Sequence, residues 1–147
     1  MRFLALAAFL LLAPLAAQAQ QFANHDVYTP LVKLTTAGAG TTDSADQLNL
    51  YGKGVVVGIN ISAKSGTIAV TVTIQGKDYV SGQYYTICES ASLTGTGFTT
   101  LTAYPGVHET ANVACSLPLP TTWRVEVVNG TGSTPSVTAT VGASVIE

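Results

Sequence analysis

The stretch TIAVTVTIQGKDYVSGQYYTICES (67–90) decides the fold class. Apolar residues occupy every second position from Ile68 to Ile74, with threonine and alanine between them, which is the pattern of a β-strand with one buried face. A turn rich in Gly, Asp and Ser (76–82) leads into a second strand-like run, QYYTICES (83–90). The stretch therefore predicts two strands joined by a turn.

The same alternation continues over much of the chain. In GVVVGINI (54–61) the apolar residues again share one face, and the short polar turn AKSG (63–66) predicts an antiparallel hairpin with the run TIAVTVTI (67–74). Further strands are expected at 98–104, 122–129 and 136–146, bounded by Gly, Pro, Asn and Ser.

The segments before residue 54 are less regular. VYTPLVKLTT (27–36) predicts a strand, and Pro30 favours an edge position because proline has no N–H to donate to a neighbouring strand. AGAGTTDSADQ (37–47) is expected to be a flexible connector, followed by a short extended piece at 48–51.

About seven short strands with regular turn signals predict an all-β protein. The expected fold is a single antiparallel β-sandwich of immunoglobulin-like or jelly-roll type. Trp123, Val125 and Val127 should enter its core, with Arg124 and Glu126 on the outside.

The N-terminus, MRFLALAAFLLLAPLAAQAQQ (1–21), has the form of a secretory signal peptide: one positive charge, an apolar run and a small-x-small motif. The apolar run is shorter than the ~20 residues that a membrane-spanning helix needs, and the motif places cleavage between Ala19 and Gln20. We expect a signal peptide at 1–19, an N-terminal segment with the edge strand at 20–42 and the β-sandwich domain at 43–147. No stable membrane span should remain after cleavage.

Charged residues make up only 10% of the 147 residues, whereas threonine alone contributes 21. After loss of Arg2, five scattered bases face eight acids, which excludes a nucleic-acid binder because phosphate recognition needs a basic stripe. A surface rich in hydroxyl groups suits packing against protein partners, including copies of the same chain, because burying threonine costs far less free energy than burying lysine or glutamate.

Cys88 and Cys115 are the two cysteines of the chain. Because the signal peptide directs the chain to an oxidising space, they are expected to form a disulfide, which requires Cα atoms within about 7 Å.

No residue pattern indicates catalysis, a cofactor or a metal. His25 follows the cleavage position and His108 lies in a loop beside Glu109, which is a weak signal for a metal site. Tyr84, Tyr85 and Tyr104 could stack on sugars, which leaves a secreted carbohydrate-binding or adhesion module as an alternative.

Several segments, of which TVTIQGKDYVSGQYYT (71–86) and LPTTWRVEVV (119–128) are the most specific, resemble a family of small β-sandwich proteins among the structural genes of tailed bacteriophages and prophages. The resemblance covers nearly all of residues 43–146. It implies a virion component at the head, or at a head or tail surface, with no enzymatic activity and no catalytic residues.

The predicted function is therefore that of a non-enzymatic structural subunit. It would serve as a phage virion or decoration component, or as an exported surface or filament subunit. Its partners would be copies of itself or a capsid, tail or surface assembly. The signal peptide predicts an exported location, whether periplasmic, cell-surface or extracellular.

Overall fold

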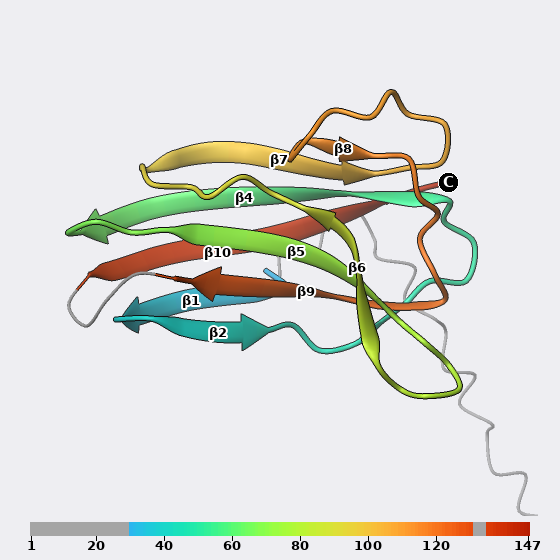
Figure 1. The fold of residues 1–147 in the computed structure, drawn as a ribbon, viewed down its shortest axis with the longest axis horizontal. Helices are drawn as coiled ribbons and strands as arrows, with labels where there is room; N and C mark the ends of the chain where they lie inside the picture. The colour runs from blue at the N-terminus through green and yellow to red at the C-terminus, as the bar shows by residue number, and fades with distance from the viewer. Residues whose placement is uncertain (1–29, 131–134) are drawn as a thin grey trace, which may run out of the picture.

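The structure is a computed structural model that describes residues 30–130 and 135–147. The described residues form β-strands and no helix (Figure 1). The predicted signal peptide and its cleavage position between Ala19 and Gln20 lie outside these residues. The strands are β1 (Val32–Ala37), β2 (Gly40–Asp43), β3 (Gln47–Leu48), β4 (Gly54–Ser65), β5 (Val70–Lys77), β6 (Tyr84–Glu89), β7 (Gly97–Ala103), β8 (Ala114–Cys115), β9 (Thr122–Asn129) and β10 (Ser136–Ile146).

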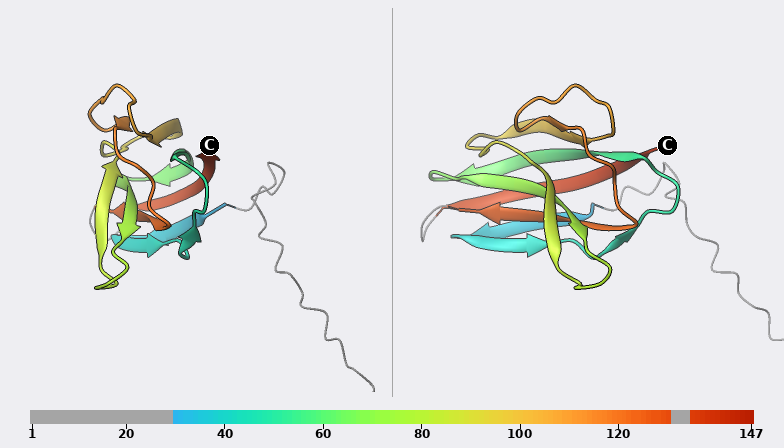
Figure 2. Two further views of the ribbon diagram at one scale, coloured as in Figure 1. Left: turned by 90° about the vertical axis from the view of Figure 1, so that its right-hand side faces the viewer. Right: turned by 45° about the vertical axis from the view of Figure 1, so that its right-hand side comes forward.

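The strands form two sheets that pack face to face (Figures 1 and 2). Sheet A has the order β1-β10-β4-β7-β8, and sheet B has the order β2-β9-β5-β6 with β3 added on β9. Every pair is antiparallel except the two-residue contact between β7 and β8. The predicted all-β antiparallel sandwich is confirmed. The strands that the prediction missed, β2, β3 and β8, are too short for alternation to show.

The connectivity is that of a jelly roll, one of the two predicted types. Pairing is nested: β1 pairs with β10, β2 with β9, β4 with β7 and β5 with β6. The chain is thus a long hairpin rolled over on itself, so that successive pairs fall in alternate sheets.

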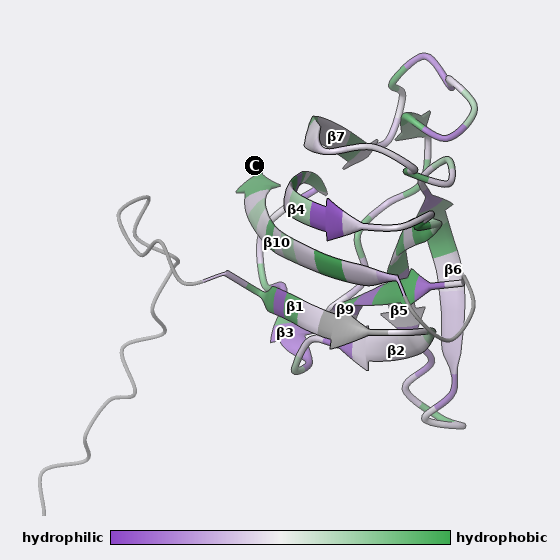
Figure 3. Ribbon diagram, turned by 90° about the vertical axis from the view of Figure 1, so that its left-hand side faces the viewer, coloured by the Kyte–Doolittle hydropathy of each residue, from purple (hydrophilic) through white to green (hydrophobic). Residues whose placement is uncertain are grey.

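The core lies between the two sheets and is built by the alternation seen in the sequence. Figure 3 shows apolar and polar residues in alternate bands along β1 and β10. The predicted core residues of β9, Trp123, Val125 and Val127, are buried, whereas Arg124 and Glu126 are on the outer side. The apolar positions of β4 and β5 are buried too.

The predicted hairpin between 54–61 and 67–74 is wrong. β4 belongs to sheet A, between β10 and β7, whereas β5 belongs to sheet B, between β9 and β6. The two strands face each other across the core instead of pairing side by side. The alternation of apolar and polar residues is the same whether the two strands pair in one sheet or lie in opposite sheets, because each strand needs only one apolar face. The hairpin within the first quoted stretch, β5 with β6, is observed.

The N-terminal strands close one side of the sandwich. β1 is an edge strand, as predicted, and β2 is the edge of sheet B, so the sheets include residues before 43. The expected connector at 37–47 is wrong for 40–43, which form β2. Gly38, with φ of 91°, turns the chain from one sheet to the other, and the buried Asn129 donates a hydrogen bond to its carbonyl oxygen at 2.9 Å.

A disulfide closes the opposite side. Cys88 on β6 and Cys115 on β8, the other two edge strands, are bonded with a Cα–Cα distance of 5.7 Å, which confirms the predicted pair. A β-bulge in β6 places Ile87 between the residues that pair with Ile74 and Gln75. Ile87 and Cys88 are consecutive yet both buried, because the extra residue shifts the alternation. The bulge therefore aims Cys88 at sheet A.

We expect the Cys88→Ala/Cys115→Ala double variant to lose about 3 kcal/mol of unfolding free energy, because a bridge spanning 27 residues restricts the unfolded chain. The melting temperature should fall by about 10 °C or more, with the circular dichroism spectrum unchanged. Reduction of the wild-type protein should reproduce the loss. An equal melting temperature for oxidised and reduced protein would contradict this role.

Candidate functional site

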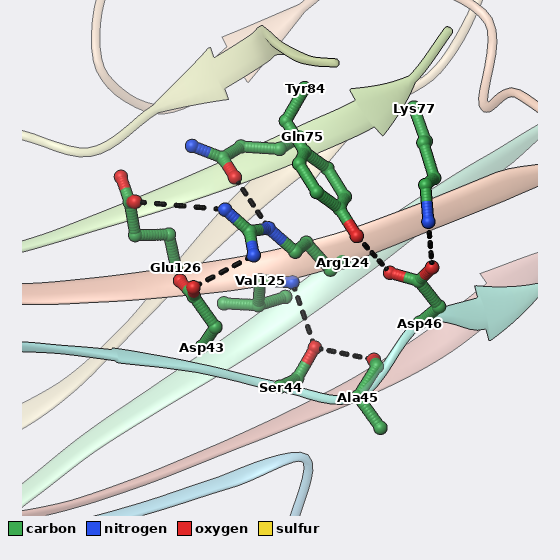
Figure 4. Close-up of polar contacts among 10 residues, drawn as sticks. All are labelled: Asp43, Ser44, Ala45, Asp46, Gln75, Lys77, Tyr84, Arg124, Val125 and Glu126. Carbon is green, nitrogen blue, oxygen red and sulfur yellow. Dashed lines mark hydrogen bonds and ion pairs between the residues drawn. The ribbon is translucent and has the colours of Figure 1, made fainter. Parts of the chain in front are cut away.

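Arg124 organises the charged side chains on the outer face of sheet B (Figure 4). Its Nε donates to Gln75 Oε1 at 2.8 Å, and its Nη1 pairs with Asp43 Oδ2 at 2.7 Å. Glu126 Oε2 is 4.0 Å from Nη2. Asp43 and Glu126 occupy facing positions on β2 and β9, where like charges repel. The guanidinium between them neutralises that repulsion.

Tyr84 extends the cluster across β6. The Arg124 guanidinium carbon lies 3.6 Å from the centre of the Tyr84 ring, a cation–π contact. The Tyr84 hydroxyl donates to Asp46 Oδ1 at 2.6 Å, and Lys77 Nζ donates to Asp46 Oδ2 at 2.8 Å. These contacts join β9, β5 and β6 to the segment after β2. We call the sheet B network the set Asp43, Asp46, Gln75, Lys77, Tyr84, Arg124 and Glu126.

The ion pair at one end of the network stays charged over a wide pH range. The hydrogen bond from Lys77, followed by that from Tyr84, lowers the pKa of Asp46 below its ordinary 3.8. The hydrogen bond to Asp46 raises the pKa of Lys77 above its ordinary 10.5. Both groups are exposed, so the pair positions a segment and adds little to global stability.

The network supports a loop. The buried Ser44 accepts a hydrogen bond from the Val125 amide at 3.0 Å and donates one to the Ala45 carbonyl at 2.9 Å (Figure 4). With Asp43 and Asp46 on either side, it fixes the start of the connection 43–54 on sheet B. The charged groups of the network bind one another, and together they hold the start of this connection in place.

One end of the sandwich exposes apolar side chains. The connections 43–54, 77–84 and 103–122 lie toward this end, together with the C-terminus, at the right of Figure 1, where 77–84 projects at the bottom and 103–122 at the top. Nine of the ten large apolar residues that are exposed among the described residues lie in or beside these connections. The tenth, Phe98, is on sheet A. We call the nine the loop-end surface: Leu48, Leu50, Tyr51, Tyr79, Val80, Tyr85, Val113, Leu117 and Val145.

The turn 77–84 presents the most exposed of these residues. Asp78 Oδ2 accepts hydrogen bonds from both the amide and the hydroxyl of Ser81, and the Gly82 amide donates to the Asp78 carbonyl at 2.9 Å. The Ser81 hydrogen bonds lower the pKa of Asp78. The braced turn holds Tyr79 and Val80 at its tip, where they are 99% and 92% exposed.

The other connections are held to each other. The buried Asn49 donates from Nδ2 to the carbonyls of Gly52 at 2.9 Å and Leu119 at 3.1 Å, and accepts from the Gly52 amide at 2.8 Å. A Cβ atom on Gly52 would lie only 2.1 Å from Val145 Cγ1 and 2.9 Å from Asn49 Oδ1, so a larger residue there would displace these side chains. The loop-end surface therefore rests on a hydrogen-bonded base.

The tyrosines proposed as a sugar platform do not share a surface. Tyr84 lies under Arg124 on the outer face of sheet B, whereas the Tyr85 ring covers Gly76 on the opposite side of the strand. Tyr104 is partly buried beside Gly54. Of the three, Tyr85 belongs to the loop-end surface.

The weak metal candidate is not assembled into a cluster. His108 and Glu109 are exposed in the connection 103–122, where Glu109 Oε1 accepts from the Ser116 amide at 3.3 Å. Within 30–130 and 135–147, no three His, Cys, Asp or Glu residues lie together as metal ligands would. His25 falls outside the described residues.

Comparison with protein-family models, curated proteins and solved structures finds no match. In the described part of the chain, no helix has the length and hydropathy needed to cross a membrane.

We expect Arg124→Met to lower the unfolding free energy by about 1–2 kcal/mol, because Asp43 and Glu126 would then face each other without a cation. Adding Asp43→Asn to this variant should restore part of the loss. Urea unfolding of the two variants and of Asp43→Asn alone measures the coupling. Additive effects of the two substitutions would show that Arg124 does not act through Asp43.

The lowered pKa of Asp46 predicts a pH dependence. The stabilisation from its ion pair is present above pH 3.8, the ordinary pKa, and is lost as the pH falls through the lowered value. Amide hydrogen-exchange protection across 43–49 should fall in that acidic range. Asp46→Asn should show the reduced protection already at pH 7. Asp78→Asn is the matched control, and should loosen only the turn 77–84.

Proposed function

We propose that the mature chain is a non-enzymatic structural subunit that docks onto a protein assembly through its loop-end surface. The observation that carries the proposal is that nine of the ten exposed large apolar side chains among the described residues lie in or beside the connections at one end of the sandwich. Removing exposed apolar area from water is favourable by about 25 cal/mol per Å², so a partner that covers these side chains gains binding free energy.

The turn 77–84 has the properties of a docking contact. Tyrosine is enriched among residues that dominate binding energy at interfaces, and Tyr79 is almost fully exposed. Because Asp78 and Ser81 already brace the turn, little conformational entropy is lost when a partner binds it. The fixed base of the loop-end surface adds to this preorganisation.

The assembly that fits best is an exported or virion structure. The disulfide is compatible with an oxidising, exported location. The resemblance to phage structural proteins supports a head decoration or a head or tail surface component. An exported surface or filament subunit would use the same features. Virion and lectin domains are among the proteins built on jelly rolls, so the fold by itself is compatible with either use.

A carbohydrate-binding module is the second candidate. Tyr51, Tyr79 and Tyr85 are all exposed at the loop end, and aromatic rings of this kind stack on sugars. These tyrosines, rather than Tyr84 and Tyr104, would form the platform.

The test compares mature wild-type protein with the Tyr79→Ser/Val80→Ser variant. Concentrated wild-type protein, alone or mixed with phage capsids, should give assemblies or decorated particles by electron microscopy and sedimentation velocity. The variant should assemble at least about tenfold more weakly, because it loses the two most exposed apolar side chains of the loop-end surface. Thr41→Ala, an exposed change on sheet B, is the control and should assemble normally.

Two outcomes would contradict the proposal. A wild-type protein that neither forms higher assemblies nor decorates capsids has no structural docking role. Binding on a glycan array that is lost in Tyr79→Ser would favour the carbohydrate-binding module instead.

A further inference from the structure

The outer face of sheet A differs from that of sheet B. None of the side chains that point outward from β10, β4 and β7 carries a charge, and Lys33 on β1 is the single charged residue at the margin. Lys64 turns away from this face and donates to the Thr94 carbonyl at 2.7 Å. Threonine, serine and glycine occupy most of the outward positions. Depletion of charge over a whole sheet face is typical of the centre of a protein interface.

Phe98 is the one large apolar side chain that stands out from this face. It is 70% exposed, and its ring leans over Gly58 on the neighbouring strand, 3.2 Å from the position of a Cβ atom built there. Phe98 pairs with Asn60, and Asn60 pairs with Thr140, so the ring is surrounded by amide and hydroxyl groups.

A patch of backbone without side chains lies beside this ring. Gly58 pairs with Gly142 on β10, so two glycines adjoin in the middle of the face. A Cβ atom built on Gly142 meets no atom within 4 Å. One face thus holds both a projecting aromatic ring and an open floor that could receive one, as an interface between two identical copies requires.

The area is sufficient for a weak dimer. β1, β10, β4 and β7 contain 6, 11, 12 and 7 residues. At ~3.3 Å per residue and ~4.8 Å between strands, they present roughly 600 Å² per copy, or about 1,200 Å² for two copies. That value is the lower limit of specific, stable interfaces.

We propose that the outer face of sheet A binds the same face of a second copy, with Phe98 of each copy seated over Gly142 of the other. The two-fold axis that relates the copies lies in the plane of the interface. It passes close to Asn60, which lies between Phe98 and Gly142 on the face of each copy. A second copy fits this face because it brings a single charge, Lys33 on the edge strand β1, and supplies the matching ring and floor. The dimer does not depend on the loop-end surface.

Sedimentation velocity of the mature chain over a concentration series tests this dimer. The measurement uses the Tyr79→Ser/Val80→Ser variant, in which assembly through the loop-end surface is weakened. This protein should dimerise with a dissociation constant in the micromolar range. Phe98→Thr should weaken the dimer at least about tenfold. Gly142→Thr should do the same by filling the floor. Because Gly142 has open space above it and is not among the positive-φ glycines, threonine should not destabilise the monomer.

Cross-linking gives an independent readout. Asn60→Cys, next to the two-fold axis, should form an intermolecular disulfide under oxidation, whereas Thr41→Cys on sheet B should not. A wild-type chain that stays monomeric well above micromolar concentration would overturn the proposal. A dimer that persists in both Phe98→Thr and Gly142→Thr would overturn it too. Melting temperatures of all variants verify that a lost dimer is not a lost fold.

Discussion

Two sheets with apolar inner faces stay together only if water is kept from entering at their sides, and this chain closes both sides. On one side, the turn at Gly38 carries the backbone from β1 directly into β2, and Asn129 fastens it from sheet B. On the other side, the bond between Cys88 and Cys115 joins the edges β6 and β8. The core residues of both sheets remain buried because these two closures hold the edges in place.

The charged side chains are distributed unequally between the two sheets. Sheet B and the segment after β2 gather most of their acids and bases into one network, in which Arg124 and Lys77 pair with the carboxylates of Asp43 and Asp46. Sheet A has almost no charge to neutralise. The network also fixes the segment after β2, from which part of the loop-end surface projects. Two surfaces of different character therefore remain for other molecules: the loop-end surface, and the outer face of sheet A, on which Lys33 is the single charged residue.

Much of the fold could be predicted from alternation, because a strand with one buried face has a period of two whatever its neighbours are. Strand pairing could not, since β4 and β5 show the same pattern in opposite sheets as they would in a hairpin. The cysteine pair was predictable from the signal-peptide pattern of the N-terminus, whereas the bulge at Ile87 that aims Cys88 inward was not. The network escaped prediction for a related reason: Arg124 and Asp43 are 81 residues apart, and only the nested pairing brings them together.

The pairing of β1 with β10 has a consequence for how the molecule is made. The first strand of sheet A has its partner in the last strand of the chain, and most of the tertiary contacts join residues distant in sequence. Such topologies fold slowly, because long loops must close before their contacts form. β10 also separates β1 from β4, so sheet A has a gap at its centre until β10 has left the ribosome. A nascent chain that lacks β10 therefore cannot complete sheet A, and the apolar faces of its strands stay uncovered until β10 arrives.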